Sequence, residues 1–190
     1  MPVILLKSAL TAALSATGIL ASAPAWAAGS SPVFDAFATV CAAPSADFAG
    51  VKAAAESQHW SATDAKPDAA MAGVTVTDTL ALASTVGKTG LVLSAWHGAT
   101  KNGVKISDCT VHVQGAVFPE VKDAAGAWLA FPAQEDAPKR AIYRFTDTAG
   151  AHRSLTSAEF DAAAAATGLQ ILTVSGDADG TVLDLMMIKK

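Results

Sequence analysis

A turn at Asn102-Gly103, between two apolar segments, constrains the fold more than any other feature of this sequence. Asn-Gly flanked by alternating apolar residues is the strongest short-range signal of a β-hairpin. We therefore expect strands over residues 91–97 and 104–114, joined by a two-residue type I′ turn. In that turn Lys101 faces Val104, which fixes the register of the whole hairpin.

This register predicts what each face of the hairpin carries. It sets Trp96 opposite Cys109 on an apolar face, and His97 opposite Asp108 on a mixed, partly polar face. The phase of the apolar pattern shifts near Ser107, which indicates a β-bulge that would misalign the histidine and the aspartate. An aligned pair and a misaligned pair therefore both remain open.

Residues 1–27 have the features of a secretory signal peptide. Lys7 is their single charge, an apolar stretch covers residues 9–20, and Ala25-Trp26-Ala27 offers a small-x-small cleavage pattern. The apolar stretch is shorter than the roughly 20 residues that span a bilayer, and no later segment looks transmembrane. We expect cleavage after Ala27, a single domain over residues 28–190, and a periplasmic or secreted location.

Export changes the chemistry expected of the two cysteines. In an oxidising compartment Cys41 and Cys109 can pair, whereas neither has a second Cys or His at the spacing of metal ligands. The bridge would close a loop of about 68 residues, for which loop entropy gives an upper figure of about 4 kcal/mol. We expect a disulfide that ties the first helix to the apolar face of the hairpin.

The pattern along the whole chain predicts an antiparallel α+β domain. Helices are expected after Ser31-Pro32, after a cap at Ser45, over residues 119–130, and from a capping box at Thr156 and Glu159 to a left-handed cap at Gly168. Strands are expected over residues 79–86, 91–97, 104–114, 141–146, 151–155, 169–174 and 182–188. Short connections dominate, so we expect one antiparallel sheet of about five to seven strands with helices mainly on one face. The last strand is apolar on both faces and should lie centrally.

Charge and motif spacing exclude several classes of function. A formal net charge of −4 leaves no basic surplus for nucleic acid. Gly87-Lys88-Thr89 resembles the end of a phosphate-binding loop, but it lacks the earlier glycine and leads into a strand. The segment 177–180 resembles a calcium loop, but Met186 stands where a glutamate is required. We therefore expect no cofactor, no metal and no nucleic-acid partner.

The polar face of the hairpin holds the candidate functional residues. His97 and Asp108 are the catalytic candidates, because an imidazole–carboxylate pair can serve as a general base or a pH switch. Together with Thr110 and His112 they are also the candidate binding residues. His97 and His112 are too far apart along the strands to share one zinc ion. A solvent-facing pair without a function is the alternative.

Several short segments carry a resemblance to a known group of proteins. They are the helix with Phe37 and Cys41, Trp60 at the end of the next helix, Trp96-His97-Gly98, and Cys109-Thr110-Val111. In these segments the chain resembles uncharacterised exported proteins of alphaproteobacteria, over roughly half of the mature chain. The resemblance implies export and a compact α+β fold, and it carries no known activity or catalytic residues.

Three functions from different classes are compatible with the sequence. The first is an exported noncatalytic protein that binds a small ligand or another protein of the cell envelope, since no catalytic motif is complete. The second is a small hydrolase that uses His97 and Asp108. The third is a structural or interaction partner in the envelope, which would require a contiguous exposed apolar patch.

Overall fold

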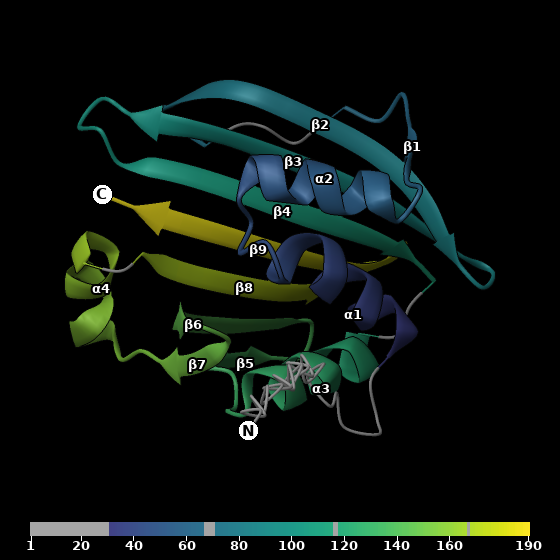
Figure 1. The fold of residues 1–190 in the computed structure, drawn as a ribbon. Coiled ribbons are helices and arrows are strands. Elements are labelled where there is room, and N and C mark those ends of the chain that lie inside the picture. The colour runs from purple at the N-terminus through teal and green to yellow at the C-terminus, as the bar shows by residue number, and fades with distance from the viewer. Residues whose placement is uncertain (1–30, 67–70, 116–117, 167) are drawn as a thin grey trace, which may run out of the picture.

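The structure is a computed structural model of the chain, and it describes residues 31–66, 71–115, 118–166 and 168–190. The predicted signal peptide lies outside the described residues. Within them, all strands join one antiparallel sheet in the order β1-β2-β3-β4-β9-β8-β6-β5, and β7 also pairs with β6 (Figure 1). The strands are β1 (Ser61–Ala62), β2 (Val74–Val86), β3 (Thr89–Thr100), β4 (Lys105–Gln114), β5 (Glu135–Ala137), β6 (Arg140–Thr148), β7 (Ala151–Ser154), β8 (Leu169–Gly176) and β9 (Gly180–Lys189).

The α+β class and the antiparallel sheet are confirmed, but the predicted strand number is too low. The described residues form nine strands, against the five to seven expected. The two strands without a predicted counterpart are β1 and β5, which are two and three residues long. All their residues are exposed, so neither has the alternation of buried and exposed side chains by which a strand is recognised.

Helices cover mainly one face of the sheet, as predicted (Figure 1). On this face lie α1 (Pro32–Phe37), the π-helical segment η1 (Ala38–Ala42), α2 (Phe48–Ser57) and α3 (Phe118–Leu129). The 3₁₀ turn η2 (Ser157–Glu159) leads into α4 (Phe160–Ala166). α4 packs against Leu169, Ile171 and Ile188, whose side chains point to the opposite face. Most of that opposite face therefore has no helix above it, and we call it the open face.

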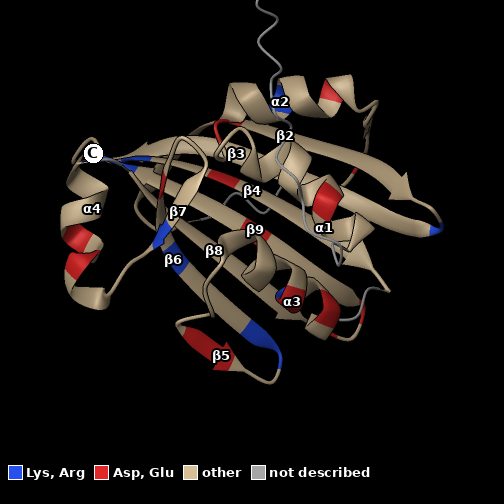
Figure 2. Ribbon diagram, turned by 60° about the horizontal axis from the view of Figure 1, so that its bottom comes forward, with Lys and Arg blue, Asp and Glu red and all other residues tan. Residues whose placement is uncertain are grey.

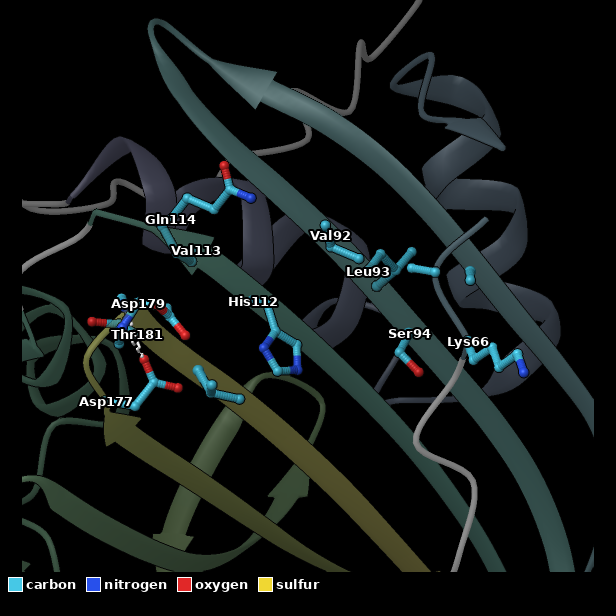
Figure 3. Close-up of a pocket in the computed structure, with 14 residues that line it drawn as sticks. Lys66, Val92, Leu93, Ser94, His112, Val113, Gln114, Asp177, Asp179 and Thr181 are labelled. Atoms are coloured by element: carbon cyan, nitrogen blue, oxygen red, sulfur yellow. Dashed lines mark hydrogen bonds between the residues drawn. The ribbon is translucent and has the colours of Figure 1, made fainter. Parts of the chain in front are cut away.

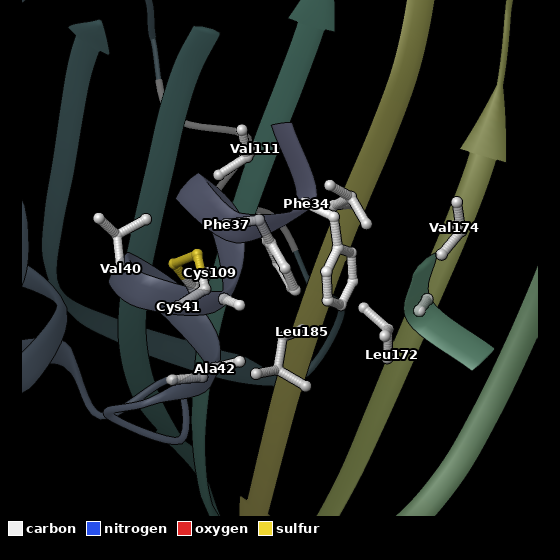
Figure 4. Close-up of a cluster of buried hydrophobic side chains, with 14 of the residues drawn as sticks. Phe34, Phe37, Val40, Cys41, Ala42, Cys109, Val111, Leu172, Val174 and Leu185 are labelled. Carbon is white, nitrogen blue, oxygen red and sulfur yellow. A yellow bond between two sulfur atoms is a disulfide. The ribbon is translucent and has the colours of Figure 1, made fainter. Parts of the chain in front are cut away.

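The core lies between the helices and the sheet, and the disulfide is part of it. Phe34 and Phe37 lie over the inward-facing side chains of β8 and β9, including Leu172 and Leu185 (Figure 4). A disulfide joins Cys41 of η1 to Cys109 of β4, with a Cα–Cα distance of 5.6 Å that suits such a bond. The predicted bridge between the first helix and the hairpin is thereby confirmed.

Two predicted helix starts had different outcomes. The cap predicted at Ser45 is wrong, since Ser45 has a φ of +54° and α2 begins later. Its cap is Asp47, whose side chain accepts a hydrogen bond from the backbone N–H of Gly50 at 3.0 Å. The capping box of Thr156 and Glu159 is confirmed, and it opens the 3₁₀ turn that precedes α4.

β4 and β9 lie side by side at the centre of the sheet. β2, β3 and β4 are neighbours in the first half, and β6, β8 and β9 are neighbours in the second half. The two sets meet where β4 pairs with β9. The central position predicted for the last strand is therefore confirmed, and side chains of β4 and β9 that are far apart in sequence become adjacent.

The loop of the β3–β4 hairpin has three residues and not the two that were predicted. The N–H of Thr100 donates to the carbonyl of Val104 at 2.9 Å, so residues 101–103 form the loop. Gly103 has a φ of +78°, as expected for the left-handed position of a three-residue hairpin loop. Because one extra residue lies in the loop, the pairing of the two strands shifts by one position.

This shift changes which side chains share a face. Trp96 faces Asp108, and His97 faces Ser107. The predicted pairs Trp96–Cys109 and His97–Asp108 are therefore wrong, although Cys109 does point toward the helices. The β3–β4 pairing is also continuous past Ser107, so the bulge expected there is absent.

Candidate functional site

His97 and Asp108, the predicted catalytic pair, lie on opposite faces of the sheet. His97 points to the helix-covered side, where its ring stacks on Phe48 with ring centroids 4.8 Å apart. Its Nε2 lies 2.8 Å from Oδ2 of Asp78. A bulge in β2 between Val76 and Asp78 brings this aspartate opposite the histidine. The structure therefore provides no imidazole–carboxylate unit from His97 and Asp108.

Asp108 instead meets a second carboxyl group on the open face. Asp184 of β9 is paired across the strands with Thr110, two residues from Asp108, so the two aspartates are diagonal neighbours. Their side chains are hydrogen-bonded to each other. Asp108 lies within β4 and Asp184 within β9, and Figure 2 shows acidic positions on both of these central strands. We call Asp108 and Asp184 the acid pair.

Burial and the neighbouring carboxylate keep Asp108 protonated. Loss of solvent, and then the negative charge of Asp184, raise the pKa of Asp108 to about 9. The hydroxyl of Thr110 donates to Oδ1 of Asp108 at 3.0 Å, and Trp96 also hydrogen-bonds to this side chain. Neither interaction offsets the effect of burial, so near neutral pH Asp108 is a proton donor.

Asp184 completes the pair as the acceptor. Burial raises the pKa of Asp184, while the hydrogen bond from Asp108 and the charge of His112 act in the opposite direction. Among the described residues, Oδ1 of Asp184 is buried and has no hydrogen-bond partner. Two adjacent carboxyl groups in such a place cannot both be ionised cheaply, so the pair holds a proton between them.

A hollow of about 340 Å³ lies on the open face (Figure 3). Neither Asp108 nor Asp184 lines it, but Val182 does, two residues from Asp184 on the same face of β9. Its aliphatic lining comes from neighbouring strands and includes Ala81, Val92 and Val182. Polar side chains from four parts of the chain complete the wall, namely Lys66, Ser94, His112, Gln114, Asp177 and Asp179. We call this hollow the open-face pocket. Its size lies at the lower end of the range of small-molecule sites.

The predicted binding residues divide between this region and the other face. His112 lines the pocket. Thr110 and Asp108 lie on the same face of β4 as His112, within the next rows of side chains. His97 lies on the other side of the sheet and contributes nothing to this region. The structure thus brings three of the four predicted residues onto one surface.

The sequence reasoning missed Asp184, the second member of the acid pair. Its signal was a lone carboxylate inside the apolar run 182–188, which was predicted to form a central strand. Carboxylates are almost never buried without a partner. The sequence therefore indicates that this carboxylate has a polar partner in a neighbouring strand, but local patterns do not show which strand that is.

The geometry does not assemble a nucleophilic site from the open-face residues. Ser94, His112 and Asp184 share a face, but the hydroxyl of Ser94 is turned away from the ring of His112 (Figure 3). No hydrogen bond is found between Ser94 and His112 in the described part of the chain, whereas a nucleophile and its base lie within hydrogen-bond reach. Ser94 and His112 therefore do not form a nucleophile–base pair in this structure.

The described residues contain no group of three or more His, Cys, Asp or Glu placed to hold a metal ion. None of their helices has the length and apolar character needed to cross a membrane. Comparison with models of protein families, with curated proteins and with solved structures found no match.

Proposed function

We propose that the protein is an exported, noncatalytic binding protein that holds a small molecule in the open-face pocket. The observation that carries this proposal is the hollow itself, where an aliphatic lining meets hydrogen-bonding side chains and none of the lining residues belongs to a helix. A ligand with an apolar body and one or two polar groups fits this combination. The N-terminal sequence and the Cys41–Cys109 bridge support export.

Two other functions have less support. The hydrolase based on His97 and Asp108 is not proposed, because these residues lie on opposite faces. Docking through an exposed apolar patch is also less favoured. Met71 is the one large hydrophobic side chain that is exposed among the described residues, and a single residue forms no contiguous patch.

Native mass spectrometry of protein purified from its own host without reductant tests the proposal. We expect an oxidised chain that begins at Ala28 and carries a copurified small molecule. Mass analysis of the released molecule would then give its chemical class. A chain that carries no molecule, from both the periplasmic and the secreted fractions, would contradict the proposal.

Binding must also be assigned to the pocket. Val92→Trp places a large ring in the hollow, whereas Thr79→Trp alters a position on the open face that does not line it. For the recovered molecule we expect Val92→Trp to weaken binding at least tenfold and Thr79→Trp to leave it unchanged. Equal affinities of the two variants would place the ligand elsewhere.

A further inference from the structure

We propose that Asp108 and Asp184 form one proton-binding unit, which the neighbouring side chain of His112 connects to the open-face pocket, so that the binding of a charged ligand there is linked to pH. This inference rests on the proposed function, because it concerns the regulation of the same pocket. It goes beyond that function by connecting the pocket to a group that the ligand itself need not touch.

The first step is the position of the unit, which lies on the two central strands β4 and β9, next to residues of the same strands that line the pocket. Asp108 lies farthest from the pocket and donates to Asp184, while His112 lines the pocket and is exposed. Along β9, Val182 lies two residues from Asp184 on the same face and also lines the pocket. A change of charge at Asp184 therefore acts on two neighbouring parts of the pocket wall.

The second step is that few other titratable or charged side chains face the unit. β3 presents Trp96 and Ser94 toward it, and β8 presents Ile171 and Thr173, none of which titrates in the range of interest. α4 packs on the same face through apolar side chains. The other charged groups that line the pocket are Lys66, Asp177 and Asp179, and none of them lies on β3, β4, β8 or β9.

The third step is electrostatic. His112 and Asp184 interact through their charges, and such an interaction is reciprocal. When the acid pair loses a proton, the region beside the pocket becomes one charge more negative. The affinity for an amine should then rise with pH, and the affinity for a carboxylate should fall, because ligand and proton act on the same charges.

Carbon-13 NMR of the aspartate carboxyl groups, in the ligand-free oxidised protein, tests the unit directly. His112→Gln removes a charge that favours the ionised form of Asp184, so the midpoint of its titration should rise by about half a pH unit or more. His97→Gln is the matched control, since it changes an imidazole on the other face. We expect it to leave this midpoint unchanged.

The link to the pocket has its own readout in the same experiment. The backbone amides of Val182 and Gln114, which line the pocket, should shift with the midpoint of the acid pair. Asp184→Asn should remove that shift. An Asp184 midpoint that does not respond to His112→Gln would overturn the unit, and pocket amides that do not follow it would overturn the coupling.

These titrations need no ligand, so the two proposals fail separately. If native mass spectrometry finds no bound molecule while the titrations behave as expected, the proposed function is wrong and the proton-binding unit stands. If a ligand is found and the titrations do not behave as expected, the binding function stands without this form of regulation.

Discussion

Replacing Asp108 by asparagine should make the protein more stable at neutral pH. An asparagine at this position can donate its amide N–H to the carboxylate of Asp184, and its carbonyl can accept from Thr110 and Trp96. The variant therefore keeps the hydrogen bonds of the protonated aspartate. The asparagine has no carboxyl proton to retain on folding. The variant therefore avoids the loss in free energy of unfolding that arises because the unfolded wild type releases this proton at neutral pH.

The sign and size of this effect follow from the two pKa values of Asp108. Its pKa is about 9 in the folded protein and 3.8 without the surrounding structure, so between these values the folded state binds the additional proton. The free energy of unfolding of the wild type then falls by about 1.4 kcal/mol for each pH unit above about 4. By pH 7 the accumulated loss approaches about 4 kcal/mol as an upper figure, and Asp108→Asn avoids it.

Urea unfolding followed by tryptophan fluorescence, at several pH values between 4 and 8, measures the difference. We expect the stability of Asp108→Asn to equal or fall below that of the wild type near pH 4 and to exceed it increasingly as pH rises. Asp123→Asn, at an exposed position of α3, is the control and should follow the wild type. Parallel curves for Asp108→Asn and wild type would show that the buried proton does not exist.

Three further perturbations test other parts of the structure. Replacing Cys41 and Cys109 by alanine should lower the free energy of unfolding in urea by up to about 4 kcal/mol, and a loss below about 1 kcal/mol would show that the bridge constrains little. Gly98→Ala places a Cβ against the backbone oxygen of Thr75 in β2 and should lower Tm strongly. Gly126→Ala, in helix α3, has its nearest neighbour, the hydroxyl of Tyr143, at 3.7 Å and should be neutral or raise Tm. His152 packs against aromatic rings, and burial lowers its pKa from 6.5, so its stabilising effect is present above about pH 6.5 and is lost as pH falls below it. His152→Phe should therefore lose less stability than wild type between pH 7.5 and 5 in urea unfolding, and equal losses would contradict the assigned cause.

The helical layer, the disulfide and the central last strand could be predicted because each has a local signal. Apolar spacing marks the first helix, two cysteines permit a single pairing, and an apolar run on both faces marks a central strand. The register of the β3–β4 hairpin could not be predicted in this way, because its turn sequence is compatible with two loop lengths. Asn102-Gly103 suits both a two-residue turn and a three-residue loop with a left-handed glycine, and the two differ by one position in register.

That single position decided the outcome for the candidate site. With a two-residue turn, Asp108 would have faced His97, and with the observed loop it faces Trp96 on the opposite side. The partner that it finds there, Asp184, comes from a strand 76 positions later in the chain. Local sequence patterns carry no information on such a pairing, because it depends on which strands become neighbours at the centre of the sheet.

The acid pair is costly for this fold, and the cost bears on its role. A buried ionisable pair is often less stabilising than apolar side chains of similar volume. The surrounding rows of β4 and β9 contain such side chains, including Ile106 and Met186, so the sheet can be built without acids. Perturbed acids next to a pocket are more typical of functional sites than of structural ones. If Asp108→Asn is more stable at neutral pH and the pocket no longer responds to pH, the pair exchanges stability for function, as functional sites commonly do. If the variant is more stable and the pocket is unaffected, the acids serve neither the fold nor the pocket, and the proposed unit is wrong.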